Sequence, residues 1–155
     1  MDKIQFQNIG LDSFIAIDVE TTGLDYNNDK IIEISAVKYK NGKENSTFSE
    51  LVNPKIKISP FITNLTGISN SMIASKEIFH EIADEFMEFI GDYPIVGHNV
   101  KFDIDFIKFH SNQSIDLSNN DICDTYLLSK IILFSNTEFS LEAITEHYKF
   151  SIKES

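Results

Sequence analysis

The sequence predicts an α/β fold with a mixed β-sheet flanked by helices, and three observations support this prediction. An apolar, β-favouring run at residues 14–17 is typical of a central strand buried on both faces. Asn41-Gly42 lies between two further β-like runs, which is a strong hairpin signal. Apolar residues recur at helical spacing over residues 77–90, which indicates an amphipathic helix.

The strands are expected to begin with an antiparallel three-strand meander. Its first strand starts at the apolar run and ends near Glu20, its second covers residues 31–39, and its third returns over residues 48–52. Shorter β-like runs at residues 94–97 and 121–124 alternate with helical patterns, so we expect them to add parallel strands to the same sheet.

Capping and spacing signals place the helices. Ser59-Pro60 opens a short one, because proline is favoured at the first helical position. Ser140 is an expected N-cap for the last one, with Phe139 and Ile144 spaced to form a hydrophobic staple. Between them, helices are predicted over residues 77–90, up to about His110, and over residues 125–132. This order of elements, β-β-β-α-β-α-β-α, fits the ribonuclease-H-like architecture.

The composition indicates one globular domain over residues 1–155. A chain of 155 residues with 42% apolar residues can bury a continuous core. No apolar run approaches the ~20 residues that span a bilayer, and the N-terminus lacks the layout of a signal peptide, so no membrane partner is expected. The single cysteine, Cys123, excludes an internal disulfide and fits a cytoplasmic location.

Two carboxylates, Asp18 and Glu20, follow the first apolar run. Side chains alternate along a strand, so both point to the same face, about 6–7 Å apart at the backbone. Two neighbouring anions on a mostly buried strand are costly unless a cation lies between them. Oxygen-only ligands favour Mg²⁺ or Mn²⁺, so the pair predicts a divalent metal site. The alternative is a strand end that emerges into water.

The context of the two carboxylates favours the metal site. They end an apolar strand, where α/β sheets place their sites, and the turn Thr21-Thr22-Gly23 that follows lets the backbone approach a ligand closely. The stretch IDVETTGL at residues 17–24 resembles the first motif of the DEDD superfamily of metal-dependent 3′–5′ exonucleases. The resemblance is greatest to the DEDDh-type proofreading group, similar to the epsilon subunit of bacterial DNA polymerase III.

A second acidic motif occupies residues 96–103, Val-Gly-His-Asn-x-x-Phe-Asp, and resembles the second motif of the same superfamily. A strand brings the chain to the sheet edge, and the helix start that follows is expected to point Asp103 toward the site. Asp105 lies about 200° further around the helix and is expected to face elsewhere. The net charge of −11 argues against coating nucleic acid by charge alone, but bound metal ions would supply local positive charge.

The resemblance implies a site with two divalent ions, Mg²⁺ or Mn²⁺, acting on the scissile phosphate. In that arrangement Asp18 bridges the ions, Glu20 binds the ion that holds the attacking water, and Asp103 completes the other side. The residues implied to contact the 3′ end are Thr21, Thr22, Gly23, Leu24, His98, Asn99 and Phe102. Loop hydrogen bonding for His98 and Asn99, and ordinary packing for Leu24 and Phe102, are the alternatives.

The resemblance also implies a third motif, a histidine followed five residues later by an aspartate, which this chain lacks. His147 is followed at that spacing by Ile152. We therefore expect an exonuclease domain truncated at its C-terminal end, with an exposed apolar patch where the next helix would pack. A natural variant that lost its chemistry is the alternative. Loss of a general base typically costs 10²–10⁴-fold in rate, so residues 1–155 alone are expected to be weakly active or inactive.

The function expected from these residues is metal-dependent 3′–5′ hydrolysis of phosphodiester bonds at single-stranded DNA 3′ ends. A DNA polymerase or another replisome component is the expected protein partner. DNA is favoured over RNA, and an RNA-trimming exonuclease is one alternative. A non-catalytic nucleic-acid- or replisome-binding module is a second, and a structural domain with incidental acids, which would bind no metal, is a third.

Overall fold

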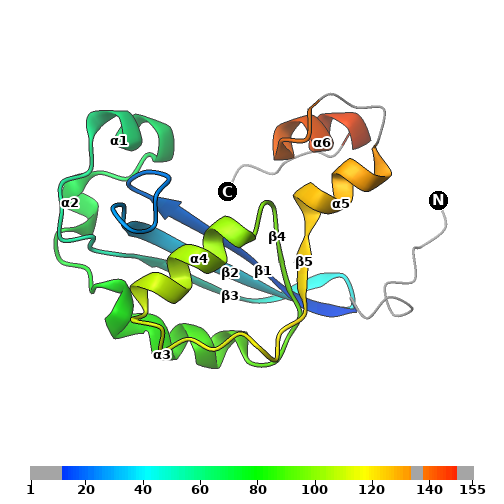
Figure 1. Ribbon diagram of the computed structural model, residues 1–155, viewed down its shortest axis with the longest axis horizontal. Helices are drawn as coiled ribbons and strands as arrows, with labels where there is room; N and C mark the ends of the chain where they lie inside the picture. Colours follow the sequence, from blue (N-terminus) through cyan, green and yellow to red (C-terminus); the bar gives the residue numbers. More distant parts are fainter. Residues whose placement is uncertain (1–11, 134–137, 150–155) are drawn as a thin grey trace.

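A five-stranded mixed sheet forms the centre of the computed structural model, which describes residues 12–133 and 138–149 (Figure 1). The strand order is β3-β2-β1-β4-β5. The first three strands are antiparallel, whereas β4 runs parallel to β1 and β5 runs parallel to β4. The bounds are β1 (Ser13–Thr21), β2 (Ile31–Lys40), β3 (Lys43–Leu51), β4 (Ile95–Gly97) and β5 (Ile122–Asp124). The predicted fold class and its meander are confirmed.

Strand β3 begins earlier than the sequence predicts. The hairpin turns at Asn41-Gly42 as expected, but β3 starts at Lys43, directly after it, and ends at Leu51. Residues 43–47 are polar and exposed, so no alternation marks them as a strand. They pair along β2 all the same, from Lys43 opposite Lys40 onward. Backbone pairing at the sheet edge therefore outweighs the weak β-propensity of these residues.

Six helices occupy the described part of the chain. The bounds are α1 (Pro60–Thr66), α2 (Asn70–Ile73), α3 (Phe79–Ile90), α4 (Lys101–His110), α5 (Thr125–Ile132) and α6 (Leu141–Tyr148). The predicted caps are present, because the Ser59 hydroxyl accepts from the N–H of Ile62 and the Ser140 hydroxyl from the N–H of Ala143, each at 3.2 Å. The Phe139–Ile144 staple stays a prediction.

Two helices differ from the prediction. Helix α2 has a single turn, too short to produce a periodic pattern, and it is absent from the predicted elements. Helix α3 starts at Phe79 rather than at residue 77, because Ile78 has an extended backbone. The N–H of Ile78 donates to Oε2 of Glu81 at 3.1 Å, which fixes the helix start there.

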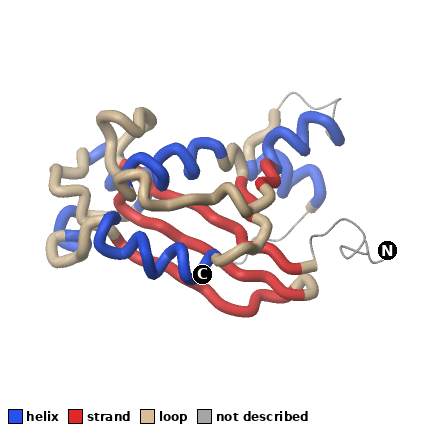
Figure 2. Tube along the Cα trace, turned by 60° about the horizontal axis from the view of Figure 1, so that its bottom comes forward, coloured by secondary structure: helices blue, strands red, loops and turns tan. Residues whose placement is uncertain are grey.

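Helices α3 and α4 cover one face of the sheet (Figures 1 and 2). Apolar residues of both helices join those of β1, β2, β3 and β4 in the main core, with Phe86, Phe106 and Ile107 fully buried. Helices α1 and α2 build a smaller cluster around Ile32. The prediction that β1 is buried on both faces is wrong, since its burial alternates and Asp18 is exposed. Helices α3 and α4 cover one face of β1, and Asp18 lies on the opposite face.

The C-terminal predictions are only partly within the described residues. Helix α6 is present as predicted, but Ile152 lies outside the described residues, so the truncated domain over residues 1–155 stays a prediction. Helices α5 and α6 do expose apolar side chains, among them Leu127, Ile131 and Leu141. None of the described helices is long and apolar enough to cross a membrane.

Candidate active site

The two acidic motifs meet at the edge of β1. Strand β4 pairs with β1 at Ile15 and Ala16 and ends at Gly97, so β1 extends beyond its neighbour from Asp18 onward. The Asp103 carboxylate, in the first turn of α4, occupies the place that β4 leaves open. Its Oδ1 accepts a hydrogen bond from the backbone N–H of Val19 at 2.9 Å. Asp103 is therefore directed to the strand that carries Asp18 and Glu20, and its side chain is buried.

Gly97 makes this approach possible. A Cβ at residue 97 would lie 2.6 and 2.8 Å from side-chain atoms of Val100 and 3.3 Å from the carbonyl oxygen of Ile17. These distances are too short for any residue other than glycine without a local shift. The chain can thus turn from β4 into α4 tightly enough to bring Asp103 against β1.

The Asp18 carboxylate repels those of Glu20 and Asp103, and no lysine in the described part of the chain offsets this charge. Burial, and then the Asp18 charge, raise the pKa of Asp103 to about 7, although the hydrogen bond from Val19 acts in the opposite direction. Partial burial of the carboxyl group raises the pKa of Asp18, although the residue as a whole keeps an exposed surface. Burial and the charges of Asp18 and Glu33 raise the pKa of Glu20. No described lysine offsets these shifts.

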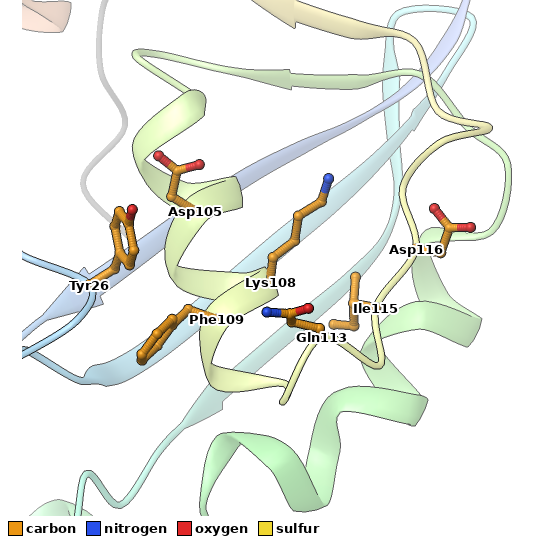
Figure 3. Close-up of a pocket in the computed structure, with 7 residues that line it drawn as sticks. All are labelled: Tyr26, Asp105, Lys108, Phe109, Gln113, Ile115 and Asp116. Atoms are coloured by element: carbon orange, nitrogen blue, oxygen red, sulfur yellow. The ribbon is translucent and has the colours of Figure 1, made fainter.

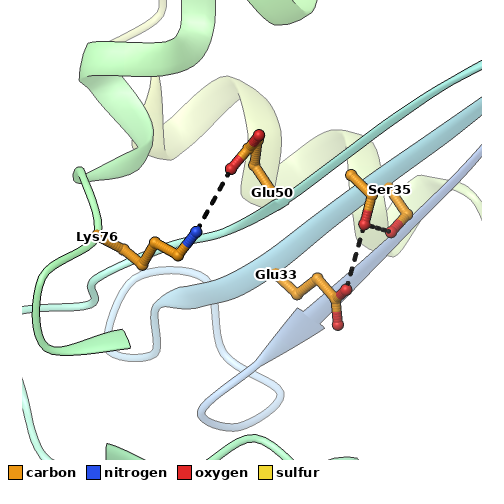
Figure 4. Close-up of polar contacts among 5 residues, drawn as sticks. Glu33, Ser35, Glu50 and Lys76 are labelled. Atoms are coloured by element: carbon orange, nitrogen blue, oxygen red, sulfur yellow. Dashed lines mark hydrogen bonds and ion pairs between the residues drawn. The ribbon is translucent and has the colours of Figure 1, made fainter. Parts of the chain in front are cut away.

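The open face of the sheet carries a fourth carboxylate close to this group. Glu33 on β2 lies directly opposite Glu20 in the antiparallel pairing, an arrangement that is unfavourable for like charges. Its Oε1 accepts from the Ser49 hydroxyl at 3.5 Å, and Ser49 contacts Ser35 at 3.4 Å (Figure 4). The nearby ion pair between Lys76 and Glu50, at 3.9 Å, does not reach these carboxylates.

The chemistry of these carboxyl groups suits a hard divalent cation. Their oxygen atoms are the ligands that such ions prefer, and their raised pKa values show that no described cation balances their charge. Asp103 is 4% exposed, so a carboxylate there is stable at neutral pH only with positive charge beside it. Among the described residues, no three acidic, histidine or cysteine side chains already lie close enough to enclose a metal ion. The carboxylates of Asp18, Glu20 and Asp103 are therefore candidate ligands by their chemistry, but they do not form a closed cage by themselves.

The turn after β1 is held by Asp29. Its Oδ1 accepts from the hydroxyl of Thr22 at 3.2 Å, and its Oδ2 accepts from the N–H of Asp25 at 3.0 Å. A Cβ at Gly23 would overlap this carboxyl group, so any larger residue here would displace Asp29 from its bonds to the turn. Thr21 is buried and its hydroxyl donates to the carbonyl of Gly23. Of the predicted contact residues in this turn, only Leu24 projects fully into solvent, at 86% exposed.

His98 and Asn99 are fixed by the junction of β5 and α5. The hydroxyl of Thr125 lies 3.0 Å from His98 Nδ1 and donates to the carbonyl of Gly97 at 3.1 Å. Oδ1 of Asp124 accepts from the N–H of Asn99 at 3.0 Å and from the N–H of Tyr126 at 2.9 Å, which also caps α5. The loop that carries the second motif is therefore attached to the next strand of the sheet.

Asp124 and Thr125 are the site residues that sequence reasoning missed. They end a predicted short strand and begin a predicted helix, and an aspartate in that position is a common N-cap. This signal could have identified the cap, but not the bonds to His98 and Asn99, which depend on how β5 lies beside β4. Asp29 gave no signal, since it lies in a polar loop.

Phe102 and Asp105 lie on other sides of α4. The Phe102 ring packs on Phe106 with centroids 4.8 Å apart and is half-buried, so it can offer only part of its surface to a ligand. Asp105 forms an ion pair with Lys101 at 2.6 Å, away from Asp103, as the helical spacing predicts. It borders a cavity of about 550 Å³, which lies along α4 with Tyr26, Lys108 and Phe109 (Figure 3). This cavity does not include the three site carboxylates.

Comparison with known proteins identifies the family. Residues 15–155 match the family described as Exonuclease (RNase_T). The chain belongs to this exonuclease family. Within it, the chain is 35% identical over 140 residues to the DNA polymerase III subunit epsilon of Aquifex aeolicus, an alignment that covers 89% of this chain and 69% of that protein.

Other exonuclease relatives are much longer. The chain is 40% identical over 139 residues to the PolC-type DNA polymerase III of Caldanaerobacter subterraneus subsp. tengcongensis, which covers 90% of this chain but 10% of that protein. It is 36% identical over 135 residues to the 3′-5′ exonuclease DinG of Bacillus subtilis (strain 168), covering 86% of this chain and 14% of that protein. The chain thus spans about a tenth of the PolC-type relatives that it matches.

Solved exonucleases share the fold. Exonuclease X in complex with 5′ overhanging duplex DNA has a TM-score of 0.70 and 24% identity, covering 92% of this chain and 76% of that one. Product-bound exonuclease I has a TM-score of 0.75 and 17% identity, covering 92% and 40%. The predicted ribonuclease-H-like architecture is thereby confirmed. Exonucleases of this superfamily generally use divalent metal ions, in agreement with the chemistry of the carboxylate group.

Proposed function

We propose that the domain is a metal-dependent exonuclease that removes nucleotides from single-stranded DNA 3′ ends, as in proofreading. The observation that carries the proposal is the contact between Asp103 and the β1 backbone beside Asp18. It brings carboxylates from two distant motifs to one sheet edge, as metal-assisted phosphodiester hydrolysis requires.

Asp18, Glu20 and Asp103 would hold two Mg²⁺ or Mn²⁺ ions. Ions bound there would neutralise charge on the scissile phosphate and activate water. The protein residues position the strand end. The Asp29-braced turn presents Leu24 to solvent beside β1, and the loop of His98 and Asn99, fixed by Thr125 and Asp124, borders the site from the other motif.

DNA is the proposed substrate because two of the relatives named above are DNA polymerase III proteins and one of the solved structures, that of exonuclease X, is a complex with DNA. A polymerase or other replisome component is the proposed partner on the same ground. A cytoplasmic location is proposed from the single cysteine. An RNA-trimming activity with the same carboxylates is the second candidate, and a matched RNA substrate separates the two.

A nuclease assay tests the proposal. A 5′-labelled single-stranded DNA is incubated with excess protein and Mn²⁺ or Mg²⁺, in parallel with an RNA of the same sequence and with a chelator. We expect slow, metal-dependent shortening from the 3′ end, faster on DNA, that disappears in Asp18→Asn. Asp92→Asn, which changes an exposed carboxylate after α3, should behave like the unchanged protein. Equal shortening by Asp18→Asn would refute the assignment.

A further inference from the structure

A second pocket, of about 240 Å³, lies where α4 ends and α3 begins, next to the start of β2 and the end of β3. Four of its lining side chains are lysines or histidines: Lys30, Lys55, His80 and His110. None of its lining residues, all within the described ranges, is acidic. In a chain with a net charge of −11, a lining that contains two lysines and no acidic residue favours an anionic ligand.

His110 contributes an unsatisfied polar atom to this pocket. Its Nε2 is buried and has no hydrogen-bond partner among the described residues. A buried polar atom without a partner is uncommon and calls for a ligand, water or ion. Burial lowers the pKa of the imidazole and the Lys30 ammonium lowers it further, which places the Lys30 charge close to the ring, whereas backbone contacts of the ring with Asp29 and Tyr26 act in the opposite direction. A bound anion would relieve both effects and accept a hydrogen bond from protonated Nε2.

Hydrogen bonds hold the backbone of Lys30 and Lys55, whereas their ammonium groups form no ion pair with a described carboxylate. The N–H of Lys30 donates to the Thr22 hydroxyl at 3.0 Å. The N–H of Lys55 donates to Oδ1 of Asn53 at 2.9 Å, and the amide of Asn53 donates to the carbonyl of Ala74 at 3.1 Å. Neither lysine forms an ion pair with a carboxylate in the described part of the chain. Helix α3 begins at the same pocket, but the Glu81 carboxylate already caps its first turn, so the positive charge at the pocket comes from the lysines.

We propose that this pocket binds a phosphate group through Lys30, Lys55 and His110. The pocket lies close to the three carboxylates, so the bound phosphate group could come from the nucleic acid strand or from a small molecule. His110 and Asp103 are two turns apart on the same face of α4, about 10 Å along the axis. The bond between Lys30 and Thr22 joins the pocket to the turn beside the carboxylates. The phosphate can therefore belong to the backbone of a nucleic acid strand or to a small free phosphate compound.

The first test uses inorganic phosphate and needs no nuclease activity. The full chain is titrated with phosphate in the presence of a chelator while side-chain NMR follows the histidine rings. We expect the His110 signals to move to saturation, while those of His147 on α6 serve as the reference. In the double variant Lys30→Ala/Lys55→Ala, the affinity for phosphate measured from the His110 signals should be at least tenfold weaker. This variant keeps the backbone bonds of both residues, and unchanged amide signals elsewhere show that it folds. Lys43→Ala, at the β2–β3 turn, should respond like the unchanged chain.

The second test separates the two sources. Binding of single-stranded DNA, again with chelator, is measured over a series of salt concentrations. If the pocket holds a strand phosphate, the slope of log affinity against log salt should fall by about 0.7 for each phosphate that the double variant no longer neutralises. An unchanged slope, with the His110 response to inorganic phosphate intact, assigns the pocket to a free phosphate compound. His110 signals that stay in place with both phosphate and DNA, or that move equally in the double variant, would overturn the proposal.

Discussion

The backbone N–H of Val19 donates to Oδ1 of Asp103 at 2.9 Å, although 84 residues separate them in the chain. This bond uses the strand-edge N–H that has no partner beyond the end of β4. It joins the two acidic motifs directly, so the fold itself holds Asp103 against β1, the strand that carries Asp18 and Glu20. The electrostatic consequences of that arrangement can be measured.

In the absence of metal, the stability of the domain should fall as the pH rises. The pKa of Asp103 is about 7 in the folded chain against 3.8 in the unfolded one. Between these values the folded state binds more protons than the unfolded state, so the free energy of unfolding decreases with pH, by about 4 kcal/mol over the whole interval and by roughly 3 kcal/mol between pH 5 and pH 8. Chemical denaturation in chelator at pH 5 and pH 8 measures this change. Asp103→Asn, which can still accept from Val19, should flatten the dependence; an equally steep dependence in this variant would show that other groups cause it.

Glu20 and Glu33 provide a matched pair of substitutions. They face each other across β1 and β2, but only Glu20 is assigned to the metal site. Losing a group that merely supports a metal ligand costs 10–100-fold, so loss of the ligand itself in Glu20→Gln should lower the exonuclease rate by more than about 100-fold. Glu33→Gln should change the rate by less than about threefold, because it removes only a repelling charge. Rate measurements on single-stranded DNA compare the two, and similar losses in both would contradict the assignment.

Thr125→Val should loosen the second motif without disturbing the core. It removes the hydroxyl that contacts His98 Nδ1 and the carbonyl of Gly97, at a cost of about 1 kcal/mol in the free energy of unfolding. We expect a larger effect on the KM for single-stranded DNA than on kcat, because His98 is assigned to substrate contact. Thr125→Ser, which keeps the hydroxyl, is the control and should restore the KM.

Gly97→Ala should be strongly destabilising. The added methyl group would overlap Val100 and approach the carbonyl of Ile17, so either α4 or β1 must shift. Overpacking of this kind costs about 1–3 kcal/mol. Thermal unfolding measures the loss. Because the shift moves Asp103, stabilisation by added metal should decrease as well. A variant with unchanged stability and unchanged stabilisation by metal would show that the turn accommodates a Cβ at residue 97.

Local patterns predicted those parts of the fold that depend on neighbouring residues. The apolar run of β1, the Asn41-Gly42 turn and the caps Ser59 and Ser140 are all where the sequence places them. The direction of Asp103 could also be predicted, since a strand followed by a helix start turns the first-turn side chain back to the sheet edge.

Features that depend on distant pairing could not be predicted. The polar residues 43–47 become a strand only because β2 lies beside them. Asp124 and Thr125 hold His98 and Asn99 because β5 aligns with β4, with Asp124 opposite Gly97. The exposure of Asp18 depends on which face of the sheet the helices cover, and this is not encoded in the periodicity of β1 itself.

Titration of the domain with Mn²⁺, followed by calorimetry, tests the central claim most directly, because it depends on the carboxylates and not on turnover. We predict saturable Mn²⁺ binding that Asp92→Asn retains and that Asp18→Asn and Asp103→Asn each weaken at least tenfold. Equal Mn²⁺ affinity in all four proteins would mean that the carboxylates at the β1 edge do not form a metal site.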